Sequence, residues 1–278
     1  MTPFRTVAGV FAAIQTVKAG AAGFCTNFFP DGQKLQDWVE RNELHGESCA
    51  GALFLFRRDH DFSRLYFCAA SPAALRAGIA TLAGLRNERI VVDLVGKESA
   101  PGEIFLALEA AGFRRYQQLC RMARPGQSAL QAAGGAELPV TLAGHADVPA
   151  ILALLEGAFD RYAEQLPLTA EIENAVASGQ IFVVRLEGVL AGLLFFETQG
   201  VTSILRYWLV AEAFRARHVG AALMRHYLAT QSTVRRFLLW VIASNDNAVQ
   251  KYRRYGFVPD GLVDHVLASE PIYNENHR

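Results

Sequence analysis

The sequence predicts an α/β protein with a mixed sheet that is built from two similar halves. Three observations lead to this prediction. Runs of apolar and β-branched residues typical of strands alternate with stretches of helical periodicity. A segment rich in Gly, Ala and Gln, Arg124–Glu137, divides the chain. The parts on either side resemble one another at a constant offset of 144 residues, the separation of Phe113 and Phe257.

The first half is expected to alternate helices and strands. Its apolar N-terminal stretch is interrupted by Gln15 and Lys18, so we expect a first helix there and not a signal peptide. Three runs have the composition of strands: Ala50–Arg57, Arg64–Ala69 and Arg89–Val95. Three stretches are expected to be helical: Gln33–Asn42, Pro72–Leu85 and Gly102–Ala111.

The second half begins with two expected helices and a hairpin. The helices are Ala146–Phe159 and Thr169–Ser178. The strands Gln180–Leu186 and Val189–Glu197 are joined by Glu187-Gly188, which is typical of a hairpin turn.

The run from Ser203 to Phe257 is the most informative part of the chain. Ser203–Val210 has the composition of a largely buried strand. After a turn, apolar residues recur at four-residue spacing from Val219, where a helix is expected to begin. A second strand near Arg235–Val241 and a short helix ending at Gly256-Phe257 complete the run.

The offset of 144 residues aligns two pairs of segments. LEAAGF at Leu108–Phe113 lies over YRRYGF at Tyr252–Phe257, and SPAALRAG at Ser71–Gly78 lies over RARHVGAA at Arg215–Ala222. A duplicated unit explains the match, and so does chance similarity between segments of the same α/β pattern. The first copy lacks the two cations of the second and has Leu108 at the position of Tyr252.

Small residues and two arginines surround the expected helix start at Val219. A helix N-terminus presents unpaired N–H groups and the positive end of the helix dipole, so it can bind an anion. The segment Arg215–Ala222 is therefore a candidate phosphate site. An ordinary helix start with solvated arginines is the alternative.

This part of the chain resembles the GNAT superfamily of N-acetyltransferases, which use acetyl-CoA. The family's pyrophosphate loop, Arg/Gln-x-x-Gly-x-Gly/Ala, corresponds to Arg215–Gly220. Its downstream signature, Asn-x-x-Ala-x-x-x-Tyr-x-x-x-Gly-Phe, is met in full by five residues: Asn245, Ala248, Tyr252, Gly256 and Phe257. The resemblance covers roughly residues 139–265 and is carried by the two motifs together.

The resemblance implies two GNAT-like acyl-CoA N-acyltransferase domains in tandem. A degenerate domain would span residues 1–123, a linker residues 124–138, and a competent acetyltransferase domain residues 139–278. Acetyl-CoA would be the co-substrate.

The resemblance also implies which residues bind CoA. Leu209 and Val210 would supply backbone donors to the thioester and the pantetheine arm, and Asn245 would bond the arm near the pyrophosphate. Asn245 can also be interpreted as a turn residue that closes the preceding strand. The pyrophosphate would lie against a loop of six residues: Arg215, Arg217, His218, Val219, Gly220 and Ala221.

His218 departs from the family pattern because it stands where the first loop glycine is expected. Glycine at that position permits a positive φ and a close approach of the ligand, which histidine tolerates less well. Its imidazole is expected either to face solvent or to contact a phosphate.

Tyr252 would also be catalytic, as the proton donor to the departing CoA thiolate. The sequence leaves the general base open. Glu197, at the end of a strand, is our candidate, and three residues on or after the first helix of this half are alternatives: Glu156, Asp160 and Glu164. Together with Glu171 and Glu173 they would suit a cationic amine, although a solvated helix face explains them equally well.

Composition limits the partners. The chain has 27 Lys plus Arg and 27 Asp plus Glu, which argues against binding nucleic acid through bulk charge. No apolar run is long enough to span a membrane. The four cysteines, none in a Cys-x-x-Cys spacing, are typical of isolated thiols in a cytoplasmic protein without a metal site: Cys25, Cys49, Cys68 and Cys120.

The predicted reaction is direct transfer of an acetyl group from acetyl-CoA to the amine of a small molecule or peptide, by a monomer or homodimer. Use of another acyl or aminoacyl donor remains open within the enzyme class. A non-catalytic acyl-CoA-binding or regulatory module is the alternative outside it, because fold does not determine function.

Overall fold

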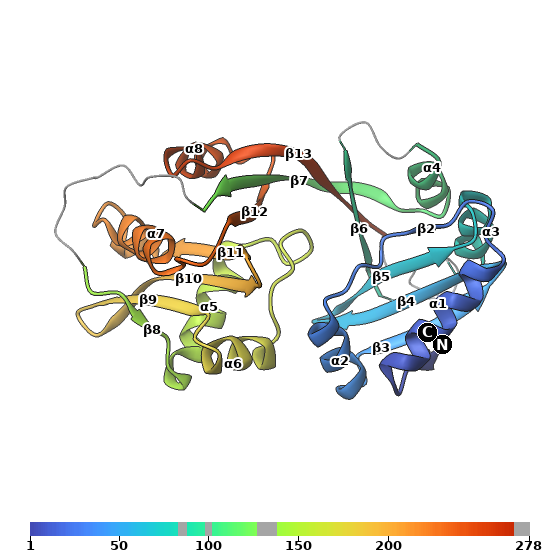
Figure 1. The fold of residues 1–278 in the computed structure, drawn as a ribbon, viewed down its shortest axis with the longest axis horizontal. Coiled ribbons are helices and arrows are strands. Elements are labelled where there is room, and N and C mark those ends of the chain that lie inside the picture. Colours follow the sequence, from blue (N-terminus) through green and yellow to red (C-terminus); the bar gives the residue numbers. More distant parts are fainter. Residues whose placement is uncertain (83–87, 98–101, 127–137, 270–278) are drawn as a thin grey trace, which may run out of the picture. The chain divides into compact units, whose positions relative to one another are not determined.

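The computed structural model describes residues 1–82, 88–97, 102–126 and 138–269, which form two compact units (Figure 1). Unit 1 consists of Met1–Gln117 and Val263–Arg278, and unit 2 is Gln118–Leu262. Most of the predicted linker, residues 127–137, lies outside the described residues. The predicted boundaries at 123 and 139 therefore stay predictions.

Unit 1 has a sheet in the order β1-β3-β4-β5-β6-β13, and β2 pairs with β5. Its strands are β1 (Thr2–Pro3), β2 (Cys25–Thr26), β3 (Leu44–Cys49), β4 (Ala52–Asp59), β5 (Phe62–Ala69) and β6 (Ile90–Lys97). Its helices are α1 (Val7–Ala19), α2 (Gly32–Glu40), α3 (Pro72–Leu82) and α4 (Gly102–Ala110).

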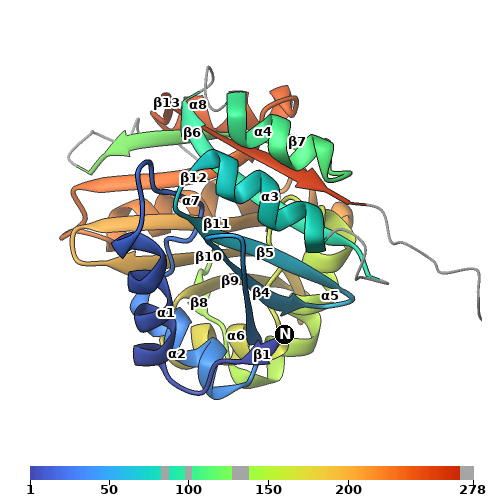
Figure 2. The same ribbon diagram turned by 90° about the vertical axis from the view of Figure 1, so that its right-hand side faces the viewer.

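Alternating side chains of β4 pack the two faces of the unit 1 sheet. Phe54 and Phe56 pack on the face that carries α3 and α4, which lie side by side in Figure 2. Leu53 and Leu55 pack against α1 and α2 on the opposite face. This is the two-residue periodicity expected of a strand buried on both sides.

Unit 2 has the strand order β7-β12-β11-β10-β9-β8. Its complete strands are β8 (Thr141–Leu142), β9 (Ile181–Leu186), β10 (Val189–Gln199), β11 (Thr202–Val210) and β12 (Arg236–Ile242). Two strands are divided between the units, β7 (Arg114–Pro125) and β13 (Val258–Ala268). Its helices are η1 (His145–Asp147), α5 (Val148–Ala158), α6 (Thr169–Ala177), η2 (Glu212–Phe214), α7 (Val219–Thr230) and α8 (Asp246–Arg254).

Two hydrophobic clusters cover the faces of the unit 2 sheet. Leu205 belongs to the cluster with α7 and α8, and Trp208 and Val210 pack against it. Tyr207 belongs to the cluster with α5 and α6, and Leu209 packs against that one (Figure 1). The face on which a β11 residue lies therefore decides which helices it meets.

The last strand of each half extends into the other unit. Residues 118–125 of β7 belong to unit 2, where they pair antiparallel with β12. Residues 263–268 of β13 belong to unit 1, where β13 neighbours β6 and the N–H of Ser269 donates to the carbonyl of Ile90 at 2.8 Å. This exchange of strands was not predicted.

The internal repeat is visible in the elements themselves. Shifting α4 by 144 residues gives 246–254, which are the bounds of α8. The same shift moves the start of β7 to Val258, where β13 begins. The prediction of a tandem α/β fold is confirmed, and every predicted strand and helix of both halves has a counterpart among the described residues. The last residues of the predicted helix Pro72–Leu85 lie outside the described part.

Candidate functional site

The sheet of unit 2 splits between β11 and β12. The parallel ladder runs from Thr202 opposite Arg236 to Leu205 opposite Leu239. Both strands continue past this point, β11 to Val210 and β12 to Ile242, without further pairing to each other. The end of β11 thus leaves one backbone edge open.

Alternation along β11 decides which backbone groups face the opening. The N–H of Ala211 donates to the carbonyl of Ala191, the residue that follows Leu190 on β10. In an antiparallel ladder successive residues direct their N–H groups to opposite sides. The N–H group of Leu209, two residues before Ala211, therefore also points toward β10. The N–H groups of Trp208 and Val210 point toward the opening. Of the two donors predicted from sequence, Val210 faces the opening and Leu209 faces its paired neighbour.

The turn between β11 and α7 adopts left-handed backbone conformations without glycine. Ala216 has φ 63°, and His218, the N-cap of α7, has φ 60°. Such values cost about 1–2 kcal/mol per non-glycine residue, although histidine visits them more readily than most. His218 therefore adopts the left-handed conformation that was expected to favour glycine. The His218 side chain is exposed.

The N-terminus of α7 offers three unused donors. The first helical hydrogen bond runs from the N–H of Ala222 to the carbonyl of His218 at 3.0 Å. The N–H groups of Val219, Gly220 and Ala221 have no acceptor in the described part of the chain. Together with the helix dipole they make this helix start a candidate anion site.

Gly220 lets α7 approach β11 closely. A Cβ atom at this position would lie 3.2 Å from both Trp208 Cζ2 and Val210 Cγ2, which is tighter than ordinary contact. Trp208 Nε1 donates to the carbonyl of Gly220 at 3.1 Å. The small residue of the motif therefore serves packing between helix and strand.

The two loop arginines lie on the surface beside the helix start. Arg215 pairs with Glu212 and Arg217 with Glu187, each at 3.2 Å. Exposed pairs of this kind contribute little, about 0–1 kcal/mol, so both guanidinium groups can turn to another anion at small cost.

Asn245 caps the N-terminus of α8. Its Oδ1 accepts from the N–H of Ala248 at 3.0 Å, and the residue is exposed. The sequence did not predict this capping role. The N–H of Asn245 donates to the carbonyl of Ile242 at 2.9 Å, as in the turn after the strand that was one of its two predicted interpretations.

Tyr252 lies on α8 beside the open end of β11. Its ring centroid is 5.6 Å from that of Trp208 and 6.0 Å from that of Phe257. Its hydroxyl makes no hydrogen bond to any described residue. Burial, together with the nearby negative charge of Glu164, raises the pKa of Tyr252 well above its usual value, so the phenol stays protonated at neutral pH.

The Gly-Phe end of the motif fixes the orientation of α8. Gly256 has φ 82°, and the N–H of Phe257 donates to the carbonyl of Tyr252 at 3.2 Å. Arg124 of β7 donates through Nε to the carbonyl of Tyr255 at 2.7 Å. The glycine permits the left-handed helix end, and the buried Phe257 anchors it in the core.

Glu164 lies in the connection between α5 and α6. Its Oε2 accepts from the N–H of Asp160 at 2.8 Å, and its own N–H donates to the carbonyl of Asp160 at 2.8 Å. Burial, with a smaller contribution from the charge of Asp160, raises the pKa of the Glu164 carboxyl group.

Glu197, the base predicted from sequence, forms an ion pair. Its carboxylate lies 3.9 Å from Nε of Arg206, the extra residue of a β-bulge on β11. Burial acts to lower the pKa of Arg206, but Glu197, Tyr207 and Glu171 together outweigh this effect and raise it. No contact joins Glu197 to Tyr252 in the described residues.

The other acidic residues that sequence suggested have different environments. Glu156 and Glu173 are exposed. Glu171 accepts from the N–H of Leu168 at the start of α6, at 2.8 Å. Asp160 accepts from the N–H groups of two following residues and so stabilises the turn.

Unit 1 has the same split in its sheet, but its own chain fills it. The β5–β6 ladder has only two paired positions, Ser63 opposite Ile90 and Arg64 opposite Val91. Beyond them Asn27 bridges the two strands. Its Nδ2 donates to the carbonyls of Leu65 at 3.2 Å and Asp93 at 3.1 Å, and its Oδ1 accepts from the N–H of Phe67 at 2.7 Å.

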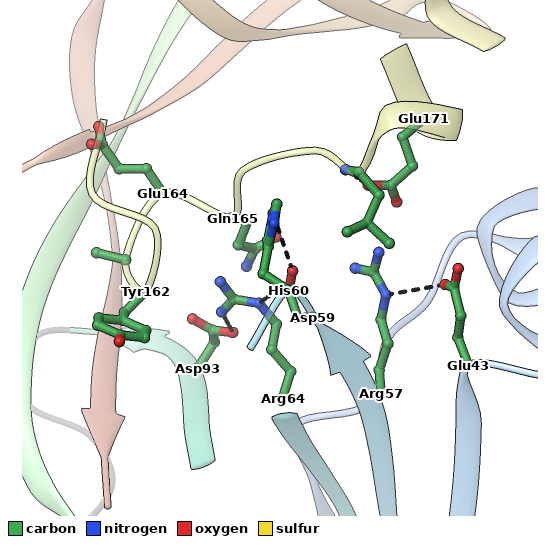
Figure 3. Close-up of polar contacts among 12 residues, drawn as sticks. Glu43, Arg57, Asp59, His60, Arg64, Asp93, Tyr162, Glu164, Gln165 and Glu171 are labelled. Carbon is green, nitrogen blue, oxygen red and sulfur yellow. Dashed lines mark hydrogen bonds and ion pairs between the residues drawn. The ribbon is translucent and has the colours of Figure 1, made fainter. Parts of the chain in front are cut away.

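A buried ion cluster lies beside this bridge in unit 1. Arg64 donates to Asp59 at 2.6 Å and to Asp93 at 2.8 Å, as the dashed lines in Figure 3 show. Its guanidinium is almost fully buried. These ion pairs join β4, β5 and β6.

The described residues contain no cluster of three or more His, Cys, Asp or Glu side chains that could hold a metal ion. Among them, no helix combines the length and apolar character needed to cross a membrane.

Comparison with known proteins agrees with the motifs. Residues 148–257 match the model of the acetyltransferase (GNAT) family. A search of curated proteins found no match. Many solved structures resemble the fold, among them the three that follow.

A tandem GNAT protein from the clavulanic acid biosynthesis pathway is 13% identical, with a TM-score of 0.63 and 99% of each chain covered. A GCN5-related N-acetyltransferase from Kribbella flavida is 16% identical, with a TM-score of 0.59, covering 88% of this chain and 96% of that one. A GCN5-related N-acetyltransferase from Sphaerobacter thermophilus is also 16% identical, with a TM-score of 0.59, covering 96% of this chain and 92% of that one.

Proposed function

Because residues 148–257 form a domain of the acetyltransferase (GNAT) family, we propose that this protein transfers an acetyl group from acetyl-CoA directly to an amine. The observation that carries the proposal is the open edge of β11, which meets the unpaired hydroxyl of Tyr252 beside a helix start with free N–H groups. Acetyl-CoA would supply the activated acyl group.

The pyrophosphate of CoA would bind at the N-terminus of α7. Val219, Gly220 and Ala221 would donate their N–H groups to it, and Arg215 and Arg217 would turn from their exposed partners to add charge. The left-handed turn at Ala216 and His218 shapes this loop.

Negative charge that develops on the thioester oxygen would be stabilised by the backbone of β11. The N–H groups of Trp208 and Val210 are the available donors because the one at Leu209 points toward β10. Tyr252 would give its proton to the departing thiolate. The raised pKa of Tyr252 keeps that proton in place across the neutral range.

We propose Glu164 as the general base, in place of Glu197. Its carbonyl contacts Tyr207 of β11, the neighbour of the Trp208 that packs against Tyr252. Its raised pKa suits a group that must accept a proton from an ammonium ion. Glu197 already forms an ion pair with Arg206, so it is less suited to accept a proton from the substrate. The acceptor would be the amine of a small molecule or a peptide.

A reducing compartment such as the cytoplasm agrees with the cysteines, all four of which are free thiols. We keep the expectation of a monomer or homodimer, which sedimentation of the purified chain would test.

Titration calorimetry with CoA and acetyl-CoA tests the binding step. We expect one equivalent per chain, bound by unit 2. Absence of binding at high micromolar ligand would refute the proposal, and two equivalents would show that the split in unit 1 also accepts ligand.

Release of free thiol from acetyl-CoA with a panel of amines tests the chemical step. Acetyl-CoA-dependent release with at least one amine is expected, at a rate that the Glu164→Gln variant lowers strongly. Tight CoA binding with no thiol release for any amine would favour a non-catalytic CoA-binding module.

A further inference from the structure

The connection between α5 and α6, which carries Glu164, is held to the sheet by one tyrosine of β11. Tyr207 is buried, and its hydroxyl lies 2.9 Å from the carbonyl oxygen of Glu164 and 2.6 Å from that of Gln165. Its ring packs edge-on against Phe159, where the connection begins, with centroids 5.1 Å apart. Figure 3 shows Glu164 and Gln165 on this loop.

The conformation after Glu164 needs such a restraint. Gln165 has φ 48°, a left-handed value that costs about 1–2 kcal/mol for a residue with a side chain. The hydrogen bond that its carbonyl accepts from Tyr207 offsets part of this cost. The backbone that follows the Glu164 side-chain attachment is therefore held by the sheet.

A β-bulge directs Tyr207 toward this loop. The ladder pairs Phe195 with Tyr207 but Phe196 with Leu205, so Arg206 is an extra residue on β11. Tyr207 consequently joins the cluster with α5 and α6, whereas Leu205, two positions earlier, joins the one with α7 and α8.

Adjacent residues of β11 thus hold the proposed acid and the proposed base from opposite faces. Trp208 contacts Tyr252 on the α7–α8 face, and Tyr207 holds the loop of Glu164 on the other face.

We propose that Tyr207 is a positioning residue that sets the place and the environment of the Glu164 carboxylate through its hydroxyl. This inference rests on the proposed function, since it assigns a role around the proposed base. The charge of Asp160 raises the pKa of Glu164, and the charge of Glu164 raises that of Tyr252. Arg206 is the charged group beside Tyr207, with its guanidinium 5.8 Å from the ring centroid.

The test compares Tyr207→Phe with Tyr227→Phe. Each removes one buried hydroxyl from unit 2 and keeps the ring, and the hydroxyl of Tyr227 bonds only to Ser203 Oγ, at 2.7 Å, among the described residues. Tyr207→Phe should lower kcat about tenfold while CoA affinity stays unchanged. Activity should rise with pH as Glu164 loses its proton, which gives kcat/KM an acidic limb. Release of the loop into solvent would lower the pKa of Glu164, so this limb should move to lower pH. Tyr227→Phe should leave that limb in place.

A double-mutant cycle separates positioning from general destabilisation. In a Glu164→Gln background, Tyr207→Phe should cause almost no further loss of kcat, because both changes remove the same function. Additive losses would overturn the proposal. If Tyr207→Phe folds poorly, adding Gln165→Gly relieves the positive φ and restores a folded protein for the same measurements.

A readout that needs no turnover distinguishes failure of this inference from failure of the proposed function. The Glu164 carboxyl group can be titrated by carbon-13 NMR in the CoA-bound protein. A downward shift of its midpoint in Tyr207→Phe supports the positioning role even if no amine is acetylated. An unchanged midpoint overturns it even if the enzyme is active.

Discussion

The two units carry the same split sheet and use it differently. In unit 2, eight residues (211–218) join β11 to α7, and they include the left-handed turn at Ala216 and His218. In unit 1, two residues (70–71) join β5 to α3, so no loop is present that could surround a pyrophosphate. Ser71 Oγ instead accepts from the N–H of Ala74 at 3.1 Å and satisfies the start of α3 internally.

The two sheet splits also differ in what occupies their backbone groups. Asn27 uses the free backbone groups of β5 and β6 in unit 1, whereas those of Trp208 and Val210 stay open in unit 2. Leu108 is fully buried where the repeat places Tyr252 in the other unit. In both units, backbone groups lose their strand partner where the sheet splits. We propose that the group taking their place, a ligand in unit 2 and a side chain in unit 1, distinguishes the catalytic unit from the structural one.

The largest expected effect concerns Tyr252. Tyr252→Phe keeps the ring against Trp208 but removes the proposed proton donor, so kcat should fall about 100-fold with CoA affinity nearly unchanged. Steady-state kinetics and calorimetry measure the two effects. Tyr255→Phe is the matched control because Tyr255 also packs on Trp208, at 5.7 Å, and should stay within about twofold of the parent. Equal kcat for Tyr252→Phe and the parent would remove Tyr252 from the mechanism.

The second expected effect concerns the filled split of unit 1. Asn27→Ala leaves the N–H of Phe67 and two carbonyl groups without their partner, so the free energy of unfolding should fall by about 2–3 kcal/mol. Chemical denaturation measures this loss. The number of CoA molecules bound per chain should remain one, since the loop before α3 is still missing.

Gln33→Ala provides the control for Asn27→Ala. It removes a single exposed hydrogen bond in the same unit, to Asp37 at 3.0 Å, and should change the free energy of unfolding by less than about 0.5 kcal/mol. A second equivalent of CoA bound by Asn27→Ala would show that Asn27 alone keeps unit 1 from binding.

The smallest expected effect concerns the loop of unit 2. His218→Gly removes a side chain from a left-handed position, so the free energy of unfolding should rise by up to about 1 kcal/mol. CoA affinity distinguishes the two predicted roles of the imidazole. An unchanged or tighter Kd indicates a solvent-facing side chain, and a weaker Kd indicates a phosphate contact. Ala216→Gly, at the other left-handed position of the loop, is the control for backbone strain alone.

Much of the fold could be predicted because its signals are local. The strand at Ser203, the helix from Val219 and the helix end at Gly256 each depend on periodicity or on one backbone requirement. The exchanged strands gave no such signal. Pro259-Asp260-Gly261 is a tripeptide typical of turns, yet it lies within β13, where Gly261 has φ 86° and Asp260 pairs with Arg121 and Arg236 at 2.8 Å. The partner Arg121 lies 139 positions before Asp260, so no local sequence signal could show that this tripeptide belongs to a strand.

The candidate site shows the same limit. The CoA loop and Tyr252 lie in one continuous motif, so their spacing could identify them together. The general base could not be identified in this way, because the position of Glu164 depends on a loop fixed by a residue about forty positions later, Tyr207. A β-bulge that reverses the alternation on β11 has no distinct sequence signal, and it decides which residues share a face.

The exchanged strands also determine when each unit can become complete during synthesis. The sheet of unit 1 includes β13, so its hydrophobic face lacks Leu267 until almost the whole described chain has left the ribosome. Unit 2, in contrast, receives β7 before any of its other strands has been made. The half that is translated first is therefore finished last, and a nascent chain that stops before β13 exposes the edge of β6 to aggregation.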